Sequence, residues 1–231
     1  MKYKEVVAAK FIERPNRFIA KVEIDGKIEV VHVKNTGRCR ELLKKGADVY
    51  LSYEDGANRK TKYDLIAVEK EVGNERRILV NMDSQVVNGV AYEWLKSGKL
   101  FSKNAIIKRE VTYGKSRFDF YIKDGENKAF LEVKGVTLEK DGIASFPDAP
   151  TERGIKHVME LSECVKNGYK GYVLFIIQME GISCFEPNSA IHKDFADALK
   201  NAKDCGVEII CIDCKVKPDE IIPGDYITVK I

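Results

Sequence analysis

Two short stretches of the sequence contain residues whose types and spacing suit the cleavage of a phosphodiester. Asp119 lies in an aromatic-rich run at residues 117–121, and Glu132 and Lys134 form a Glu-x-Lys triplet that begins thirteen residues later. Two carboxylates a few ångströms apart repel each other, and a divalent cation relieves that repulsion. Hard oxygen ligands favour Mg²⁺ or Mn²⁺. Lys134 would then orient an attacking water or stabilise developing negative charge.

Both halves of this motif have the composition of β-strands. The runs 118–122 and 129–133 are rich in aromatic and β-branched residues, and residues 123–127 between them are turn formers. This pattern predicts a β-hairpin. Because side chains alternate along a strand, Glu132 and Lys134 point to the same face, where Asp119 of the adjacent strand can join them. An acidic-x-basic triplet is also common on the solvated face of an ordinary hairpin, and that alternative stays open here.

The elements around the motif predict an α/β protein of two domains, with residues 1–81 as the first and residues 82–231 as the second. In the first domain, strands are predicted at 6–13, 17–24, 28–33, 48–53, 64–71 and 76–80, with one helix at 38–45. Three strands, a helix and further strands are typical of an OB-like β-barrel. The second domain alternates helices at 82–97, 151–166 and 190–204 with strands at 104–113, 117–122, 129–133, 172–178 and 207–214. That order predicts a central mixed sheet with helices on its faces.

Charge is unevenly distributed between these domains. Residues 1–81 carry 18 Lys and Arg against 13 Asp and Glu, a net charge of +5, whereas residues 82–231 carry 21 against 23, a net charge of −2. OB-like barrels often bind single-stranded nucleic acid through basic and aromatic side chains. A basic first domain therefore favours DNA as the partner, bound through its phosphate backbone in single- or double-stranded form. The candidate phosphate-binding residues of this domain are Arg14, Arg17, Lys34, Arg38 and Arg40.

The segment Asn35-Thr36-Gly37 lies directly before two of these arginines. Its backbone N–H groups, beside Arg38 and Arg40, are suited to receive a phosphate. The alternative is an ordinary strand-to-helix turn in which Thr36 caps the helix.

Composition narrows the class of protein further. No apolar run is long enough to span a membrane, and the chain does not start with a basic and then apolar signal, so we expect a cytoplasmic protein without membrane contact. The six cysteines lack the paired clusters of a zinc ribbon, and we expect free thiols. Cys211 and Cys214 form a C-x-x-C spacing inside an apolar run that is typical of a buried strand. No small-molecule cofactor is indicated, and the sequence leaves the oligomeric state open.

The element order resembles that of the PD-(D/E)xK, or restriction-endonuclease-like, nucleases, with an Asp on the second core strand and Glu-x-Lys on the third. In that superfamily a further acid near the start of the core often adds a metal ligand, and Glu110 is the candidate. Five segments in order also resemble the sugar fermentation stimulation protein A (SfsA) family. These segments are Arg38-Cys39-Arg40-Glu41-Leu42-Leu43, Ser116-Arg117-Phe118-Asp119-Phe120, Leu131-Glu132-Val133-Lys134-Gly135-Val136-Thr137-Leu138, Phe146-Pro147-Asp148-Ala149-Pro150-Thr151-Glu152-Arg153-Gly154 and Lys156-His157.

The resemblance implies an OB-like N-terminal domain, a nuclease-like C-terminal domain and DNA binding without marked sequence preference. It also implies a role in regulating the metabolism of maltose or other sugars. Thr36 stands where the family usually has Pro before the Gly, which alters the turn more than any chemistry.

Four further side chains are candidates for the predicted site. Gln178 ends an apolar strand and could hold a water or a base edge near the metal, and His157 lies on the helix that follows the Pro-bounded loop. Arg153, at the start of that helix, would reinforce a phosphate site at the helix N-terminus. Arg117 precedes the motif Asp by two residues, and both arginines are candidates for binding DNA.

Two functions follow from these residues. The first is a DNA-binding protein with a metal-dependent nuclease site, in which Asp119, Glu132 and Glu110 hold Mg²⁺ or Mn²⁺ and Lys134 positions the water. The alternative is a non-catalytic DNA-binding regulator on an inactive nuclease scaffold, whose affinity rests on phosphate contacts and falls steeply with salt.

Overall fold

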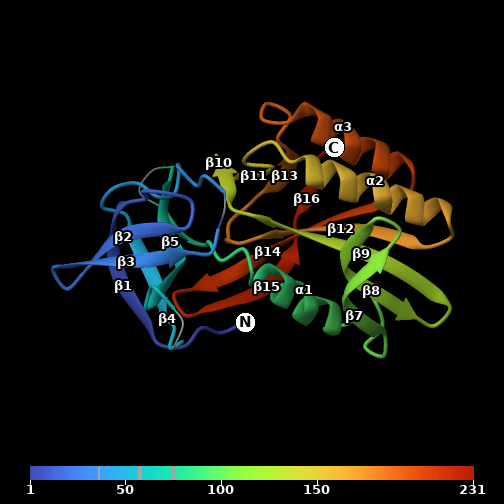
Figure 1. Ribbon diagram of the computed structural model, residues 1–231. Helices are drawn as coiled ribbons and strands as arrows, with labels where there is room; N and C mark the ends of the chain where they lie inside the picture. Colours follow the sequence, from blue (N-terminus) through green and yellow to red (C-terminus); the bar gives the residue numbers. More distant parts are fainter. Residues whose placement is uncertain (36, 57–58, 74–75) are drawn as a thin grey trace.

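The computed structural model describes residues 1–35, 37–56, 59–73 and 76–231, which form a β-barrel followed by a larger α/β domain (Figure 1). The barrel domain is built from six strands. They are β1 (Val6–Glu13), β2 (Ile19–Ile24), β3 (Lys27–Val33), β4 (Asp48–Tyr53), β5 (Tyr63–Val72) and β6 (Arg76–Asn81).

Pairing of β3 with β5 closes the first five strands into a barrel. The strands run in the order β3-β2-β1-β4-β5-β6, and parallel pairs of His32 with Asp64 and of Val33 with Leu65 join β3 to β5. Alternate side chains point inward, as the two-residue period of a strand requires. Small and branched apolar side chains fill the interior: Ala20, Val22, Val31, Val33, Val49, Leu51 and Leu65. The predicted OB-like barrel is confirmed.

The helix predicted at residues 38–45 is wrong. This segment forms successive turns, in which the backbone N–H groups of Leu42 and Leu43 both donate to the carbonyl of Cys39. Cys39 has a φ of 46°, a left-handed conformation that does not propagate as an α-helix. Cys39 and Leu42 are buried in the barrel core, so burial of these two side chains overrides the local helical pattern.

The second domain contains three helices and two sheets within the described residues. Its helices are α1 (Val87–Lys96), α2 (Glu152–Lys166) and α3 (Lys193–Asp204). Its main sheet consists of β7 (Ile106–Tyr113), β8 (Ser116–Asp124), β9 (Asn127–Val136), β12 (Lys170–Ile177), β14 (Glu208–Lys217) and β15 (Glu220–Tyr226). A smaller sheet joins β10 (Leu138–Lys140), β11 (Ile143–Phe146), β13 (Cys184–Pro187) and β16 (Thr228–Val229).

The main sheet is mixed, as predicted. Its order is β15-β14-β12-β9-β8-β7, in which β9, β12 and β14 are parallel and the outer pairs are antiparallel. Helix α1 lies on one face, and α2 and α3 lie on the other (Figure 1). Along β9, Leu131 and Val133 pack with the α1 cluster, while Phe130 packs with the α2 cluster. The same alternation directs Glu132 toward α2.

Several strands had no recognisable sequence signal. Strand β15 contains Pro223 and Gly224, residues that are rare inside strands, and the strands of the smaller sheet have only two to four residues. Such short runs are too brief to display a two-residue period.

The cysteines behave as expected for structural thiols. All six are free and only Cys205 is exposed. Cys211 and Cys214 are buried in β14, and this burial raises the pKa of both thiols, which is unlike a redox site. No helix of the described part of the chain is long and apolar enough to cross a membrane.

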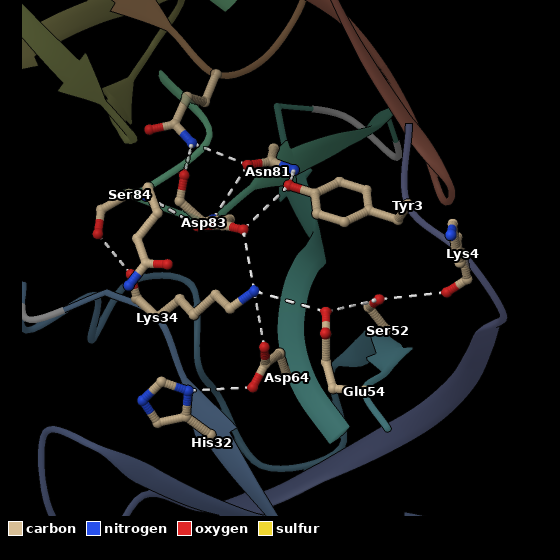
Figure 2. A network of polar contacts seen from close by, with 12 residues as sticks. Tyr3, Lys4, His32, Lys34, Ser52, Glu54, Asp64, Asn81, Asp83 and Ser84 are labelled. Carbon is tan, nitrogen blue, oxygen red and sulfur yellow. Dashed lines mark hydrogen bonds and ion pairs between the residues drawn. The ribbon is translucent and has the colours of Figure 1, made fainter. Parts of the chain in front are cut away.

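The two domains meet at a partly buried ionic cluster around Lys34 (Figure 2). The Lys34 ammonium lies 2.7 Å from Asp64 Oδ2, 3.7 Å from Asp83 Oδ2 and 3.7 Å from Glu54 Oε1. Asp64 belongs to β5 of the barrel, whereas Asp83 lies between β6 and α1. Ser84 donates a further backbone hydrogen bond to the carbonyl of Lys34. The cluster therefore ties the end of β3 to the entrance of the second domain.

A second set of contacts extends this junction into the main sheet. Gln178, directly after β12, donates from Nε2 to Asn81 Oδ1 at 2.9 Å and to the carbonyl of Asp83 at 3.0 Å. The backbone N–H of Asn81 donates in turn to the carbonyl of Gln178. Asn81 Nδ2 also donates to the hydroxyl of Tyr3, whose own N–H donates to the carbonyl of Asp219. The residues before β1 thus lie against the second domain.

The charge of Asp64 is expected to stabilise this junction at neutral pH. Burial alone would raise the pKa of Asp64, but hydrogen bonds from Lys34, Arg59 and His32 outweigh it and lower the pKa. Asp64→Asn leaves the Lys34 ammonium poorly compensated, so we expect a loss of about 3 kcal/mol in the free energy of unfolding. Urea unfolding measures this loss.

The loss should depend on pH. A lowered native pKa stabilises the fold above the ordinary carboxylate pKa of about 4, and this contribution disappears as the pH falls through the native pKa. The difference between wild type and Asp64→Asn should therefore shrink in acid. The exposed Asp55→Asn is the control, and a loss no larger than that of the control would contradict the ionic account.

Candidate active site

The predicted hairpin is present, and its two strands separate at Asp119. The pairing of β8 with β9 runs from Asp124 opposite Asn127 to Phe120 opposite Leu131. Beyond Phe120, Asp119 Oδ2 accepts a hydrogen bond of 2.8 Å from the backbone N–H of Val133. The carboxylate thereby satisfies a strand N–H that would otherwise need a partner. Asp119 is fixed beside the Glu-x-Lys triplet as a result.

A side chain from α1 completes the hold on Asp119. Asn88 Nδ2 donates to Asp119 Oδ1 at 2.8 Å. Sequence reasoning missed Asn88. Its sequence signal was a single amide among Val86, Val87 and Val90, at the start of the helix that precedes the core strands.

Glu132 and Lys134 share one face of β9, as predicted. Lys134 Nζ donates to Glu132 Oε1 at 2.6 Å, and His157 Nδ1 of α2 forms a hydrogen bond with the same oxygen. Glu132 is 3% exposed, and its Oε2 has no hydrogen-bond partner in the described part of the chain. One oxygen of this carboxylate is therefore fully engaged and the other is buried and unsatisfied.

The two carboxylates have opposite pKa shifts. Burial and the negative charge of Glu132 raise the pKa of Asp119, although Val133 and Asn88 donate to it. For Glu132, burial acts in the same direction, but the hydrogen bond from His157 and the Lys134 ammonium outweigh it and lower the pKa. Glu132 is therefore held ionised, and its negative charge raises the pKa of Asp119 more than the nearby Lys134 ammonium lowers it.

This donor set fits a divalent cation that keeps part of its water shell. Within the described residues, no group of three or more His, Cys, Asp or Glu side chains is arranged to hold a metal. Mg²⁺ commonly uses one or two carboxylates, with waters and substrate phosphate as the other ligands. Such a cation would give the unsatisfied Oε2 of Glu132 a partner, and it would relieve the repulsion between Glu132 and Asp119.

Two predicted site residues have partners other than the two carboxylates. Glu110, on β7, is exposed and pairs with Arg117 rather than with the two carboxylates, and its φ of 58° marks an irregularity in the strand. Gln178 is buried at the domain junction, where Asn81 and Asp83 bind its amide nitrogen. The structure thus brings together Asp119, Glu132, Lys134 and His157, and it separates Glu110 from them.

Four predicted DNA-binding residues gather at one groove of the barrel. The groove has a volume of about 450 Å³ and runs between β1 and the loop that follows β3. Arg14, Arg17, Arg38 and Arg40 line it, together with Lys45. Arg17 also stacks on the half-exposed ring of Phe18, 4.8 Å from its centroid.

Arg14 and the basic candidates outside the groove have different roles. Arg14 donates to the backbone carbonyls of Arg17, Asn35, Gly37 and Arg38, so its guanidinium organises the wall of the groove. Lys34 is the centre of the partly buried cluster at the junction. Arg153 is exposed in the first turn of α2. Thr36, and with it the proposed cap or phosphate turn, lies outside the described residues.

Comparison with known proteins matches both domains. The family model for the sugar fermentation stimulation protein RE domain matches residues 85–220, and that for the SfsA N-terminal OB domain matches residues 12–81. A sugar fermentation stimulation protein homolog of Desulfitobacterium hafniense (strain Y51) is 57% identical over 231 residues, covering 100% of this chain and 99% of the relative. The homolog of Clostridium beijerinckii is 54% identical over 229 residues, with 99% of both chains covered.

A solved structure is also similar over its whole length. Pyrococcus furiosus SfsA, in complex with Ca²⁺, superposes with a TM-score of 0.88 at 29% identity, covering 100% of this chain and 98% of the other.

The hydrogen bond from Asn88 should contribute to stability through Asp119. Asn88→Ala removes a donor to a carboxylate, and we expect the free energy of unfolding to fall by about 1.5 kcal/mol in EDTA. Asn88→Asp should cost more, because a third negative charge faces Asp119, and Mg²⁺ should recover more of that loss. Urea unfolding with and without Mg²⁺ measures both effects. The exposed Asn104→Ala is the control, and unchanged stability of Asn88→Ala would contradict the role of this contact.

Proposed function

The chain belongs to the sugar fermentation stimulation protein family, and we propose that it is a DNA-binding protein with a metal-dependent phosphodiesterase site. The observation that carries the proposal is the buried, unsatisfied Oε2 of Glu132, beside Asp119 and Lys134. A buried carboxylate oxygen without a donor is costly unless a cation or water occupies its vicinity. Family membership is consistent with a link to sugar metabolism.

Asp119 and Glu132 would hold the cation, and Mg²⁺ or Mn²⁺ suits their oxygen donors. When bound, such an ion polarises a phosphoryl oxygen and makes a bound water more acidic. Pyrococcus furiosus SfsA was solved in complex with Ca²⁺, another cation that prefers oxygen ligands, which supports a divalent cation for this chain.

The surrounding side chains have separate tasks in this proposal. His157 and Lys134 both bind Oε1 of Glu132, which leaves Oε2 available to a cation. Asn88 and the N–H of Val133 hold both oxygens of Asp119 in place. The Lys134 ammonium, only 14% exposed, would orient a water or stabilise charge on the phosphate.

The arginine groove supports binding to the phosphate backbone. Arg17, Arg38 and Arg40 line a single groove, and the half-exposed Phe18 beside Arg17 offers a face for base stacking. Phosphate contacts carry no sequence information, which agrees with binding that has no marked sequence preference.

Replacement of Asp119 should abolish cleavage through loss of the cation, and replacement of Lys134 should abolish it with the cation still bound. Labelled single- and double-stranded DNA is incubated with protein and Mg²⁺ or Mn²⁺. We expect Asp119→Asn and Lys134→Ala to cut at least about 100-fold more slowly than wild type. Binding of Mn²⁺, measured by calorimetry, should be lost in Asp119→Asn and retained in Lys134→Ala.

Asp124→Asn, at the other end of β8, is the matched control and should cut as wild type does. Equal, negligible cutting by wild type and variants would exclude a nuclease. Salt-dependent DNA binding in that case would leave the non-catalytic regulator as the function.

The arginine groove should set the salt dependence of binding. Replacing Arg38 and Arg40 together by Ala should weaken DNA binding and reduce the slope of log K against log salt by about 0.7–0.9 for each phosphate that is no longer neutralised. Lys123→Ala with Lys128→Ala, two exposed lysines on the β8–β9 hairpin, is the control of equal charge. An equal effect of both double variants would contradict a specific role for the groove.

A further inference from the structure

A small pocket lies where the loop after β3 meets the second domain. Its volume is about 180 Å³, below the 300–1,000 Å³ or so that holds a drug-sized ligand. Asn35 and Gly37 line it from the barrel side, and Thr137, Ser145, Phe146 and Gln178 line it from the second domain. The two domains therefore build this pocket jointly.

Two glycines shape its walls at close range. A Cβ at Gly37 would lie 2.5 Å from Asp148 Oδ2, and a Cβ at Gly135 would lie 2.7 Å from Gln178 Oε1. Neither position has room for a side chain, because both distances are well below an ordinary van der Waals contact. The polar atoms of Asp148 and Gln178 thus stand directly against backbone at the pocket wall.

Gln178 presents a fixed acceptor to this pocket. Its Nε2 is held by Asn81 Oδ1 and by the carbonyl of Asp83, and the residue is 1% exposed. No side chain or backbone group in the described part of the chain donates to its Oε1. Because Gln178 lines the pocket, a donor from a ligand or from water can reach this oxygen there.

The pocket lies between the two parts of the proposed phosphate path. It shares Gly37 with the arginine groove, and it reaches Gly135, the residue after Lys134. At about 3.3 Å per residue along β9, Gly135 is roughly 10 Å from Glu132. A strand that runs from the arginines to the two carboxylates would pass over the pocket.

We propose that this pocket receives one unstacked base of a single-stranded nucleic acid; the inference rests on the proposed function and names its substrate class. The lining of the described residues contains no Lys or Arg, so a phosphate has no counter-charge there. The small volume admits a single base ring system, and the hydroxyls of Thr137 and Ser145 suit a polar ring edge. Every base has an N–H donor on its pairing edge, so one acceptor at Gln178 tolerates all four.

A base can enter only when it is unpaired and unstacked, which costs least in a single strand or at a frayed end. We therefore expect the protein to bind and cut single strands better than blunt duplex. The base contact adds to the phosphate contacts without adding a sequence preference.

An abasic scan tests the pocket in the full-length protein. A single-stranded DNA of mixed sequence carries one abasic site, which is moved position by position, and binding in Ca²⁺ and cleavage in Mg²⁺ are measured. An abasic site at one position next to the cleaved phosphate should weaken binding about tenfold, the scale expected when a single base no longer contacts the protein.

Variants of the pocket should remove that sensitivity. Ser145→Leu fills the pocket and should bind intact and abasic strands equally, whereas Ser189→Leu, at an exposed turn, should behave as wild type. Thr137→Val removes a hydroxyl with little change in shape, and it should reduce the abasic effect even if Ser145→Leu folds poorly.

The outcomes separate the two proposals. A wild type that binds DNA but shows no sensitive position, or that prefers blunt duplex, overturns the base pocket and leaves the proposed function intact. A protein that neither binds nor cuts DNA removes the proposed function, and the inference with it.

Discussion

The partial burial of one ammonium group, that of Lys34, is the constraint on which the relation between the two domains depends. A charge removed from water is tolerated only where opposite charges and hydrogen bonds compensate for the missing solvation. Asp64 supplies this compensation from the barrel, and Asp83 supplies it from the segment that enters the second domain. The position of the barrel relative to the second domain is thus stabilised by carboxylates from both sides that neutralise one ammonium group.

The same junction determines where the arginine groove lies. Lys34 directly follows β3, and its carbonyl accepts a hydrogen bond from Ser84. The chain then reaches Gly37, which lies against the Asp148 carboxylate of the second domain. Arg14 donates to three carbonyls of this loop and so fixes its backbone. Lys34 and Arg14 bind other groups of the protein, and they thereby position the exposed arginines of the groove.

The candidate active site has the opposite electrostatic character. At the junction, a partly buried cation is surrounded by carboxylates, whereas at the site two carboxylates approach each other, with one oxygen of Glu132 unsatisfied. A buried carboxylate oxygen without a hydrogen-bond donor lowers the stability of the free protein, and such arrangements persist where a ligand completes them. Lys34 and Glu132 both take part in a lysine–carboxylate ion pair. The partners of Lys34 satisfy its charge, which indicates a structural role, whereas the unsatisfied oxygen of Glu132 indicates a binding role.

Sequence patterns predicted the parts of this molecule that local periodicity controls. The alternation of Glu132 and Lys134 on one strand face, the hairpin that brings Asp119 beside them and the barrel all follow from two-residue periods and turn residues. Periodicity does not report which of several lysines and arginines becomes buried. Lys34 and Arg14 have the residue types of phosphate binders, but each has its partners on segments distant in sequence, so only the closed barrel reveals their internal roles. Gln178 was assigned to the metal site for the same reason, since a polar residue at a strand end gives no sign of which domain it faces. The fold thus uses some of its polar residues as internal partners. The buried Oε2 of Glu132 has no such partner in the described part of the chain, and the amide oxygen of Gln178 accepts no hydrogen bond there, so both can bind a ligand.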